Sequence, residues 1–216
     1  MKGLLLKDFL QLKTYVKSMS IILIMYSFMI FSEENVNSMM SLATTIFMIL
    51  GTMIALSTFT RDEKGNINRY LLTLPVDKKD LVKEKYALCL ITILIGALFG
   101  TIISLVAIKL TGKPFPNIED FLSSVLGGIT GVSLLVGLQI PFMYKYGAEK
   151  GRISIYVLAI IIIFISSIPN LFHWHINFTI PTIIDKLFPI VLLLIITIIY
   201  IVSYFISLKI VEKKDL

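Results

Sequence analysis

Six long stretches of this 216-residue chain contain no Asp, Glu, Lys or Arg. A helix crosses a hydrocarbon core of about 30 Å with about 20 residues, and a charge at its centre costs roughly 2.5–3.5 kcal/mol. The stretches therefore predict an all-α integral membrane protein with six transmembrane helices. They are Ser18–Ser32, Asn35–Thr60, Tyr86–Ile108, Phe121–Tyr144, Ile153–Ile184 and Leu187–Leu208. Composition agrees, because 16% of the residues are charged against about 25% in soluble domains.

The loops between these stretches carry positive charge unevenly. Seventeen of the 20 lysines and arginines lie in the two termini and the second and fourth loops. By the positive-inside rule, both termini are expected in the cytoplasm of a multi-pass plasma-membrane protein. The net charge of +6 then reports topology. Nucleic-acid binding is disfavoured, because the basic residues are divided among four short segments.

Residues 1–17 precede the first apolar stretch and have an amphipathic pattern. Leu5, Phe9, Leu12 and Val16 fall on one helical stripe. We expect an interfacial helix along the inner leaflet. A simple anchoring role and a partner-binding role both remain open.

The predicted spans lack the ionisable residues that proton-driven transport or catalysis within the membrane would require. Their central parts contain no ionisable side chain, which disfavours a proton-driven transporter and an intramembrane enzyme. No phosphate-binding P-loop motif is present, so we expect no catalytic residue and no cofactor in this chain. His173 and His175 flank Trp174 and are interpreted as an interfacial belt, since a zinc site needs three or four ligands. No metal site is predicted.

Two G-x-x-x-G pairs indicate places where helices can approach closely: Gly96 with Gly100, and Gly127 with Gly131. A subunit interface and packing within one protomer are both open for each pair. Pro141 predicts a kink near Gln139, where a backbone carbonyl freed from the helix needs a partner.

The fifth stretch is too long for one straight span. Its end, together with the next two residues, forms segment 169–186, which is too apolar for a solvated loop and too short to cross and return. We interpret 169–186 as a re-entrant or interfacial element on the outer side, and a structural plug and a substrate gate are both open.

The second loop, Arg61–Lys85, is the largest cytoplasmic piece and divides at Pro75. We expect residues 61–76 to form a short helix with Asp62 and Glu63 near its start. Asp77 resembles the start of a capping box for the next helix, and the lysines after it are expected at the anionic inner leaflet. The short helix could transmit a push from a soluble partner or simply lie on the surface.

Three motifs resemble those of the small six-span permeases of the ABC-2 type. They are M-K-G-L-L-L-K-D at Met1–Asp8, F-T-R-D-E-K-G at Phe59–Gly65 and Y-L-L-T-L-P-V-D-K-K-D-L-V-K-E-K-Y at Tyr70–Tyr86. Within that family the chain looks like the membrane subunits of exporters of phenol-soluble modulins and antimicrobial peptides.

The resemblance implies one transmembrane domain over residues 1–216. Two copies of a separate ATPase would bind ATP and Mg, and a second permease subunit would complete a homodimer or heterodimer. The cargo would be amphipathic or hydrophobic peptides moving outward. The ATPase-coupling helix would fall on Asp62, Glu63, Lys64, Asn66, Ile67, Asn68, Arg69, Tyr70, Leu71 and Leu72.

Two other functions stay open. One is an ABC exporter of drugs or lipids. Another is a membrane immunity or sensor protein that binds toxic peptides without transporting them.

Overall fold

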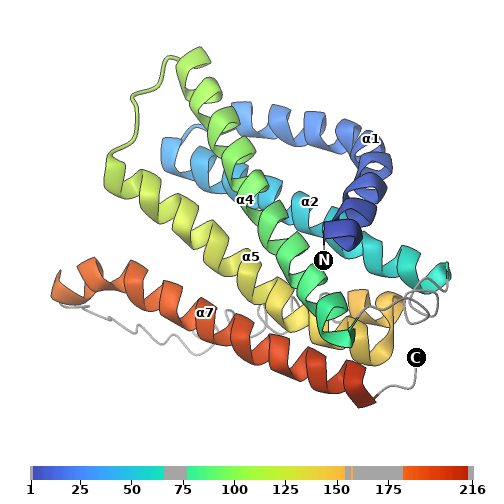
Figure 1. Cartoon of the computed structure of the whole chain (residues 1–216). Helices are drawn as coiled ribbons and strands as arrows, with labels where there is room; N and C mark the ends of the chain where they lie inside the picture. The colour runs from blue at the N-terminus through green and yellow to red at the C-terminus, as the bar shows by residue number, and fades with distance from the viewer. Residues whose placement is uncertain (1, 66–76, 154–156, 158–181, 214–216) are drawn as a thin grey trace.

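The computed structural model describes residues 2–65, 77–153, 157 and 182–213. Within these ranges every regular element is a helix. The long helices are α1 (Lys2–Ser32), α2 (Val36–Lys64), α4 (Lys78–Leu110), α5 (Ile118–Tyr146) and α7 (Thr182–Lys213). Residues 148–153 are also helical. Figure 1 shows α2, α4, α5 and α7 running side by side, with α1 bent across α2 and α4.

Four of these helices are long and apolar enough to cross a membrane: α2, α4, α5 and the Leu193–Lys213 part of α7. They correspond to the second, third, fourth and sixth predicted spans. The first predicted span does not stand alone, because α1 is one continuous helix that also includes most of the predicted interfacial segment 1–17. Its apolar end, Ile21–Ser32, is shorter than these spans. Most of the fifth predicted span and most of segment 169–186 lie outside the described residues.

The outer surface of the bundle is apolar, as a lipid-facing surface requires. On α4, Leu98, Phe99 and Ile102 are 63%, 57% and 56% exposed, whereas Gly96 and Gly100 on the opposite face are buried. A water-soluble helix would show the reverse pattern, with its apolar stripe inside and polar residues outside. The helices therefore bury their small residues and present their large ones outward.

The Gly96–Gly100 pair packs α4 directly against the backbone of α2. A Cβ atom on Gly96 would lie 2.7 Å from Met48 Cα, and one on Gly100 would lie 2.6 Å from Thr44 Cα. Neither position has room for a methyl group. This pair therefore serves packing within one protomer, which decides one of the two alternatives that the sequence left open.

The Gly127–Gly131 pair behaves differently although its spacing is the same. A Cβ atom at either position would meet nothing within 4 Å in the described structure. Both glycines line an apolar groove of about 410 Å³ with Thr45, Ile49 and Leu138. The described helices leave this groove open.

Pro141 frees one backbone carbonyl of α5, and α7 supplies its partner. Proline has no N–H, so the carbonyl of Gly137, four residues earlier, loses its helical hydrogen bond. Ser203 Oγ of α7 donates a hydrogen bond to that carbonyl. Tyr86 of α4 bonds to Ser203 and, at 2.9 Å, to Ser207. The predicted need for a partner at the proline is confirmed, and the bond joins three helices.

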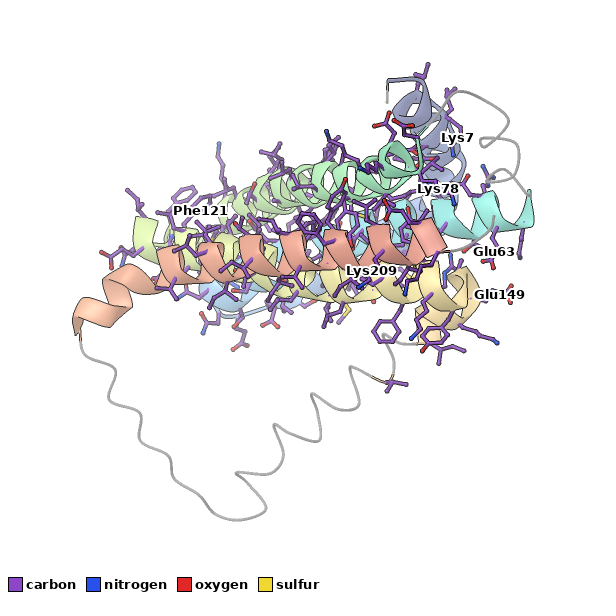
Figure 2. All side chains as sticks on the ribbon, turned by 60° about the horizontal axis from the view of Figure 1, so that its bottom comes forward. Lys7, Glu63, Lys78, Phe121, Glu149 and Lys209 are labelled. Atoms are coloured by element: carbon purple, nitrogen blue, oxygen red, sulfur yellow. The ribbon has the colours of Figure 1, made fainter. Side chains whose placement is uncertain are left out.

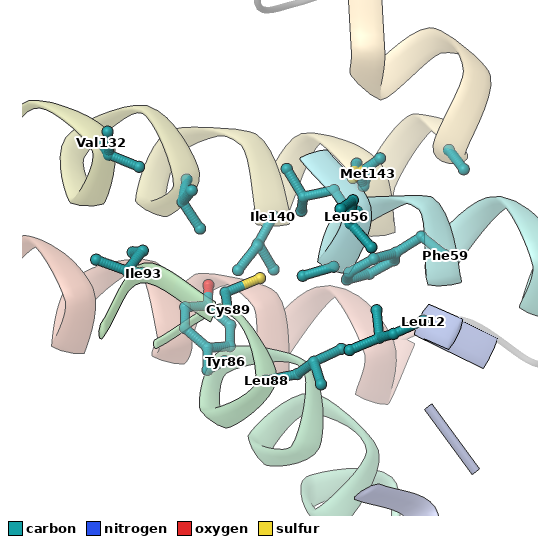
Figure 3. Packing of buried hydrophobic residues seen from close by; sticks show 14 of the residues in the cluster. Leu12, Leu56, Phe59, Tyr86, Leu88, Cys89, Ile93, Val132, Ile140 and Met143 are labelled. Carbon is teal, nitrogen blue, oxygen red and sulfur yellow. The ribbon is translucent and has the colours of Figure 1, made fainter. Parts of the chain in front are cut away.

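The apolar core fills the space between this network and the end of the bundle where α2 ends and α4 begins. Figure 3 shows Phe59 of α2, Ile140 and Met143 of α5, and Cys89 of α4 converging there. Leu12 of α1 joins them and is 8% exposed. A second cluster, around Met39 and Ile108, occupies the other end. Phe59 of this core also contacts the buried ammonium group of Lys85.

We predict that Gly96→Ala destabilises the protein by about 1–3 kcal/mol, because the new methyl group must displace backbone atoms of α2. Gly131→Ala is the matched control. It should be neutral or slightly stabilising, since its methyl group has space and alanine favours a helix. Thermal unfolding in a mild detergent compares the two variants, and equal effects would contradict the packing described here.

We also predict that Ser203→Ala costs about 1 kcal/mol in the natural background and much less when combined with Pro141→Ala. In the latter background residue 141 regains its N–H and can bond to the Gly137 carbonyl itself. A double-mutant cycle on the free energy of unfolding measures this coupling, and additive effects would show that the two residues do not share the carbonyl.

Candidate functional site

A cluster of five ionisable side chains lies where α2 ends and α4 begins, next to the start of α1. We call it the charge cluster: Lys7 and Asp8 of α1, Asp62 of α2, and Glu84 and Lys85 of α4. Asp8, Asp62, Glu84 and Lys85 are at most 5% exposed. Figure 2 shows Lys7, Lys78, Glu63 and Glu149 toward this end of the bundle and Phe121 at the opposite end.

Lys85 is the centre of the cluster. Its ammonium group lies 2.7 Å from Asp8 Oδ2, 2.6 Å from Asp62 Oδ2 and 2.9 Å from Thr58 Oγ1. An ammonium group has three N–H donors, so these three acceptors satisfy all of them. The ring of Phe59 also faces the ammonium group, at 5.2 Å. One side chain of α4 therefore holds α1 and α2 together.

Lys7 closes the cluster from the solvent side. Its Nζ lies 3.0 Å from Asp62 Oδ1 and 3.2 Å from Asp8 Oδ1, and its side chain is 24% exposed. Burial by itself would lower the pKa of Lys7, but the neighbouring Asp62 and Asp8 carboxylates outweigh it and raise the pKa above its ordinary value. Lys7 is therefore a permanent positive charge at neutral pH.

Glu63 joins a fourth element to this end of the bundle. Its Oε2 accepts a hydrogen bond of 2.7 Å from the backbone N–H of Ala148, where the short helix after α5 begins. A carboxylate at this point caps the helix and complements its dipole. Gly147 adopts φ +89°, and a Cβ there would lie 2.6 Å from Glu63 Oε1. Only glycine suits this turn.

The predicted coupling residues fall into two groups, Asp62 to Lys64 and Asn66 to Leu72. Asp62, Glu63 and Lys64 do not begin a separate short helix, because α2 continues through Lys64 and is capped at Gly65. That part of the expectation is wrong: the helical ladder of α2 extends beyond the apolar stretch, since Lys85 neutralises Asp62. Lys64 is exposed and lies 3.9 Å from Glu149. The remaining residues, Asn66 to Leu72, lie outside the described part of the chain.

The structure also corrects two expectations about charges. Lys85 was expected at the lipid headgroups, but it is buried and ion-paired. Asp77 is the N-cap of α4, yet its side chain makes no capping hydrogen bond.

Sequence reasoning also missed Asp8 and Glu84. For Glu84 the available signal was its position in the sequence. Glu84 and Lys85 directly precede one span and Asp62 closely follows another, so antiparallel helices place these three residues at one depth.

The described residues contain no group of three or more His, Cys, Asp or Glu side chains arranged to hold a metal ion. Four members of the charge cluster, Lys7, Asp8, Asp62 and Lys85, form ion pairs instead. Their geometry fixes the two ends of the segment between Gly65 and Asp77 relative to each other and to α1.

We predict that Lys85→Met destabilises the protein by about 3–5 kcal/mol, the cost of leaving a buried ion pair with one partner removed. Lys83→Met, on the exposed side of the same helix turn, should change stability little. Unfolding monitored by circular dichroism in detergent compares them. Equal stability of the two variants would mean that the cluster does not hold the helices together.

Comparison with known proteins identifies the family. Residues 3–212 match the ABC-2 family transporter protein family, so the chain belongs to it. No curated protein and no solved structure matches the chain. Family membership and the four apolar helices make this a multi-pass membrane protein, a permease that works with an ABC ATPase.

Proposed function

We propose that this ABC-2 permease exports amphipathic or hydrophobic peptides from the cell or its inner leaflet, driven by two copies of a separate ATPase. The family match over residues 3–212 carries the proposal. A second permease subunit, identical or related, would complete the transporter. The ATPase would bind ATP and Mg, and this chain would carry no catalytic residue or cofactor.

The charge cluster supports the coupling part of the proposal. The proposed coupling segment, residues 62–72, begins in the last turn of α2, and the loop that contains it ends at α4. Asp62 and Lys85 bind these two ends to each other, and Asp8 and Lys7 bind them to α1. A push from the ATPase on this segment would therefore move α1, α2 and α4 as one unit.

Glu63 and Lys64 extend the same surface toward the short helix that starts at Ala148. A groove there is lined by Thr60, Glu63, Lys64, Tyr146, Gly147, Glu149 and Lys150. Glu149 and Lys64 are 78% and 71% exposed in their side chains and can adapt to a charged partner. We infer that the ATPase contacts both this groove and the segment 66–72.

The cargo assignment rests on polarity and resemblance. The groove at Gly127 and Gly131 is almost entirely apolar and has no charged lining residue. Such a surface suits an amphipathic peptide or a lipid-like molecule better than an ion or a sugar. The same groove is where a second permease subunit could approach α5 closely, because small residues let helix backbones meet.

Orientation follows from the charge distribution. If the cluster end faces the cytoplasm, both termini lie on that side of the plasma membrane, with 17 of the 20 basic residues. The ATPase could then reach the coupling segment. The opposite orientation would place the charge cluster and the coupling segment outside the cell, away from ATP.

Two other functions remain as alternatives: an exporter of drugs or lipids, and an immunity or sensor protein that binds toxic peptides. The first would differ from our proposal only in what stimulates ATP hydrolysis. The second would protect cells without any ATPase partner.

We predict that gentle purification from native membranes yields a stoichiometric P-loop ATPase. Arg69→Ala with Tyr70→Ala should weaken its affinity by roughly 30-fold, as expected when about 2 kcal/mol of interface energy is lost. These residues are better targets than Asp62, whose substitution would also break the buried ion pairs.

The control is Glu119→Gln, an exposed position at the other end of the bundle, which should leave the ATPase bound. If no ATPase accompanies the natural protein in any mild detergent while cells remain protected from peptides, the immunity function would replace the export function. If lipids or drugs but no peptide stimulate ATP hydrolysis in vesicles, only the cargo assignment fails.

A further inference from the structure

Among the members of the charge cluster, Glu84 is the one for which the described structure shows neither an ion pair nor a hydrogen bond of its side chain. Its side chain is fully buried, and neither carboxylate oxygen has a hydrogen-bond partner in the described structure. Lys85 donates its three N–H groups to Asp8, Asp62 and Thr58. Lys7 forms ion pairs with Asp62 and Asp8. An ionised carboxylate without a donor is among the most costly groups to bury.

Asp8 has the complementary deficiency. Its Oδ1 lies 3.2 Å from Lys7 Nζ but accepts no hydrogen bond of good geometry, although the side chain is fully buried. Asp8 binds the ammonium group of Lys85, and Lys85 lines the same cavity as Glu84. Burial raises the pKa of Glu84, the Lys85 charge lowers it, and the Asp8 carboxylate raises it again, which leaves the pKa above its ordinary value at about 7. Two ionised carboxylates cannot bond to each other, because both are acceptors only. A single proton between them would supply the missing donor.

The charge count agrees with a bound proton. Lys7 and Lys85 balance Asp8 and Asp62, so a neutral Glu84 makes the cluster neutral, whereas an ionised Glu84 leaves one excess negative charge. Around Glu84, α1 contributes Lys7 and Asp8, α2 contributes Asp62 and Glu63, α4 contributes Lys85, and α5 contributes Tyr144. None of these groups adds a further positive charge.

A route for the proton is present. Glu84 lines a cavity of about 150 Å³ with Glu63, Asp62, Ala148 and Val211. A cavity needs only about 10–15 Å³ to admit one water molecule when polar partners are available. Water entering here could exchange a proton with Glu84 while the surrounding helices stay packed.

We infer that Glu84 and Asp8 share one proton and form a proton-binding site that closes the junction between α1 and the ends of α2 and α4. With the proton bound, Glu84 donates to Asp8 and every charge in the cluster is paired. Loss of the proton places two like charges side by side and weakens the attachment of α1. The coupling machinery of this permease is therefore sensitive to cytoplasmic pH, a regulatory property that rests on the proposed orientation.

The direct test is infrared difference spectroscopy of the purified protein against Glu84→Gln. At neutral pH we expect the C=O stretch of a protonated carboxylic acid in the natural protein that the variant lacks. On titration to alkaline pH this band should give way to ionised carboxylate bands. If the difference spectrum at neutral pH contains only ionised carboxylate bands, Glu84 is a hydrated carboxylate and the inference is overturned.

Thermal unfolding against pH supplies a second readout. The folded protein would hold a proton that the unfolded chain releases above a glutamate pKa of about 4.3, so stability should fall as pH rises. We expect the melting temperature to fall by roughly 3–5 °C for every tenfold difference in proton affinity between the two states. Glu84→Gln, which resembles the protonated acid, should lack this dependence.

The matched control is Glu149→Gln, whose side chain is 78% exposed and which should keep the pH dependence of the natural protein. A pH dependence that persists in Glu84→Gln would assign the proton to another group and overturn the inference. Neither measurement requires an ATPase or a cargo, so a failure here is separable from a failure of the export function.

Discussion

The ammonium group of Lys85 is the interaction on which the junction end of this protein depends. Three helices begin or end there, and each brings a charged or polar group that cannot be buried alone. The charge of Lys85 can be buried because Asp8, Asp62 and Thr58 accept hydrogen bonds from all three N–H groups of its ammonium group. Without it, Asp62 could not lie in the last turn of α2, where the helix dipole already disfavours a negative charge.

The same logic, a freed polar group that needs a partner from another helix, recurs deeper in the bundle. Pro141 removes a hydrogen bond from the Gly137 carbonyl, and Ser203 restores one from α7. Tyr86 then links this bond to α4, one residue after Lys85 in the chain. The ionic junction and the hydroxyl network are thus adjacent on α4, so a movement at one is transmitted to the other through a short stretch of helix.

The two glycine pairs show how far sequence reasoning reached. Spacing alone predicted that helices could approach closely at both pairs, and the described structure confirms this only for Gly96 and Gly100. Only the coordinates distinguish Gly96 and Gly100, which contact the backbone of α2, from Gly127 and Gly131, which face an open groove. The motif records that a helix can approach another closely, and the identity of the neighbour depends on how the whole bundle is arranged.

The sequence by itself determined the membrane character, the positions of four spans and the family, because charge-free length and local motifs are properties of consecutive residues. It also located the proline that needs a partner. Only the tertiary structure revealed the charge cluster, since Lys7 and Asp8 lie more than fifty residues from Asp62 and more than seventy from Lys85 along the chain. Each of these residues alone resembles an ordinary interfacial charge. Their burial follows from antiparallel packing that brings the ends of α2 and α4 to one depth beside α1, where pairing compensates the loss of water.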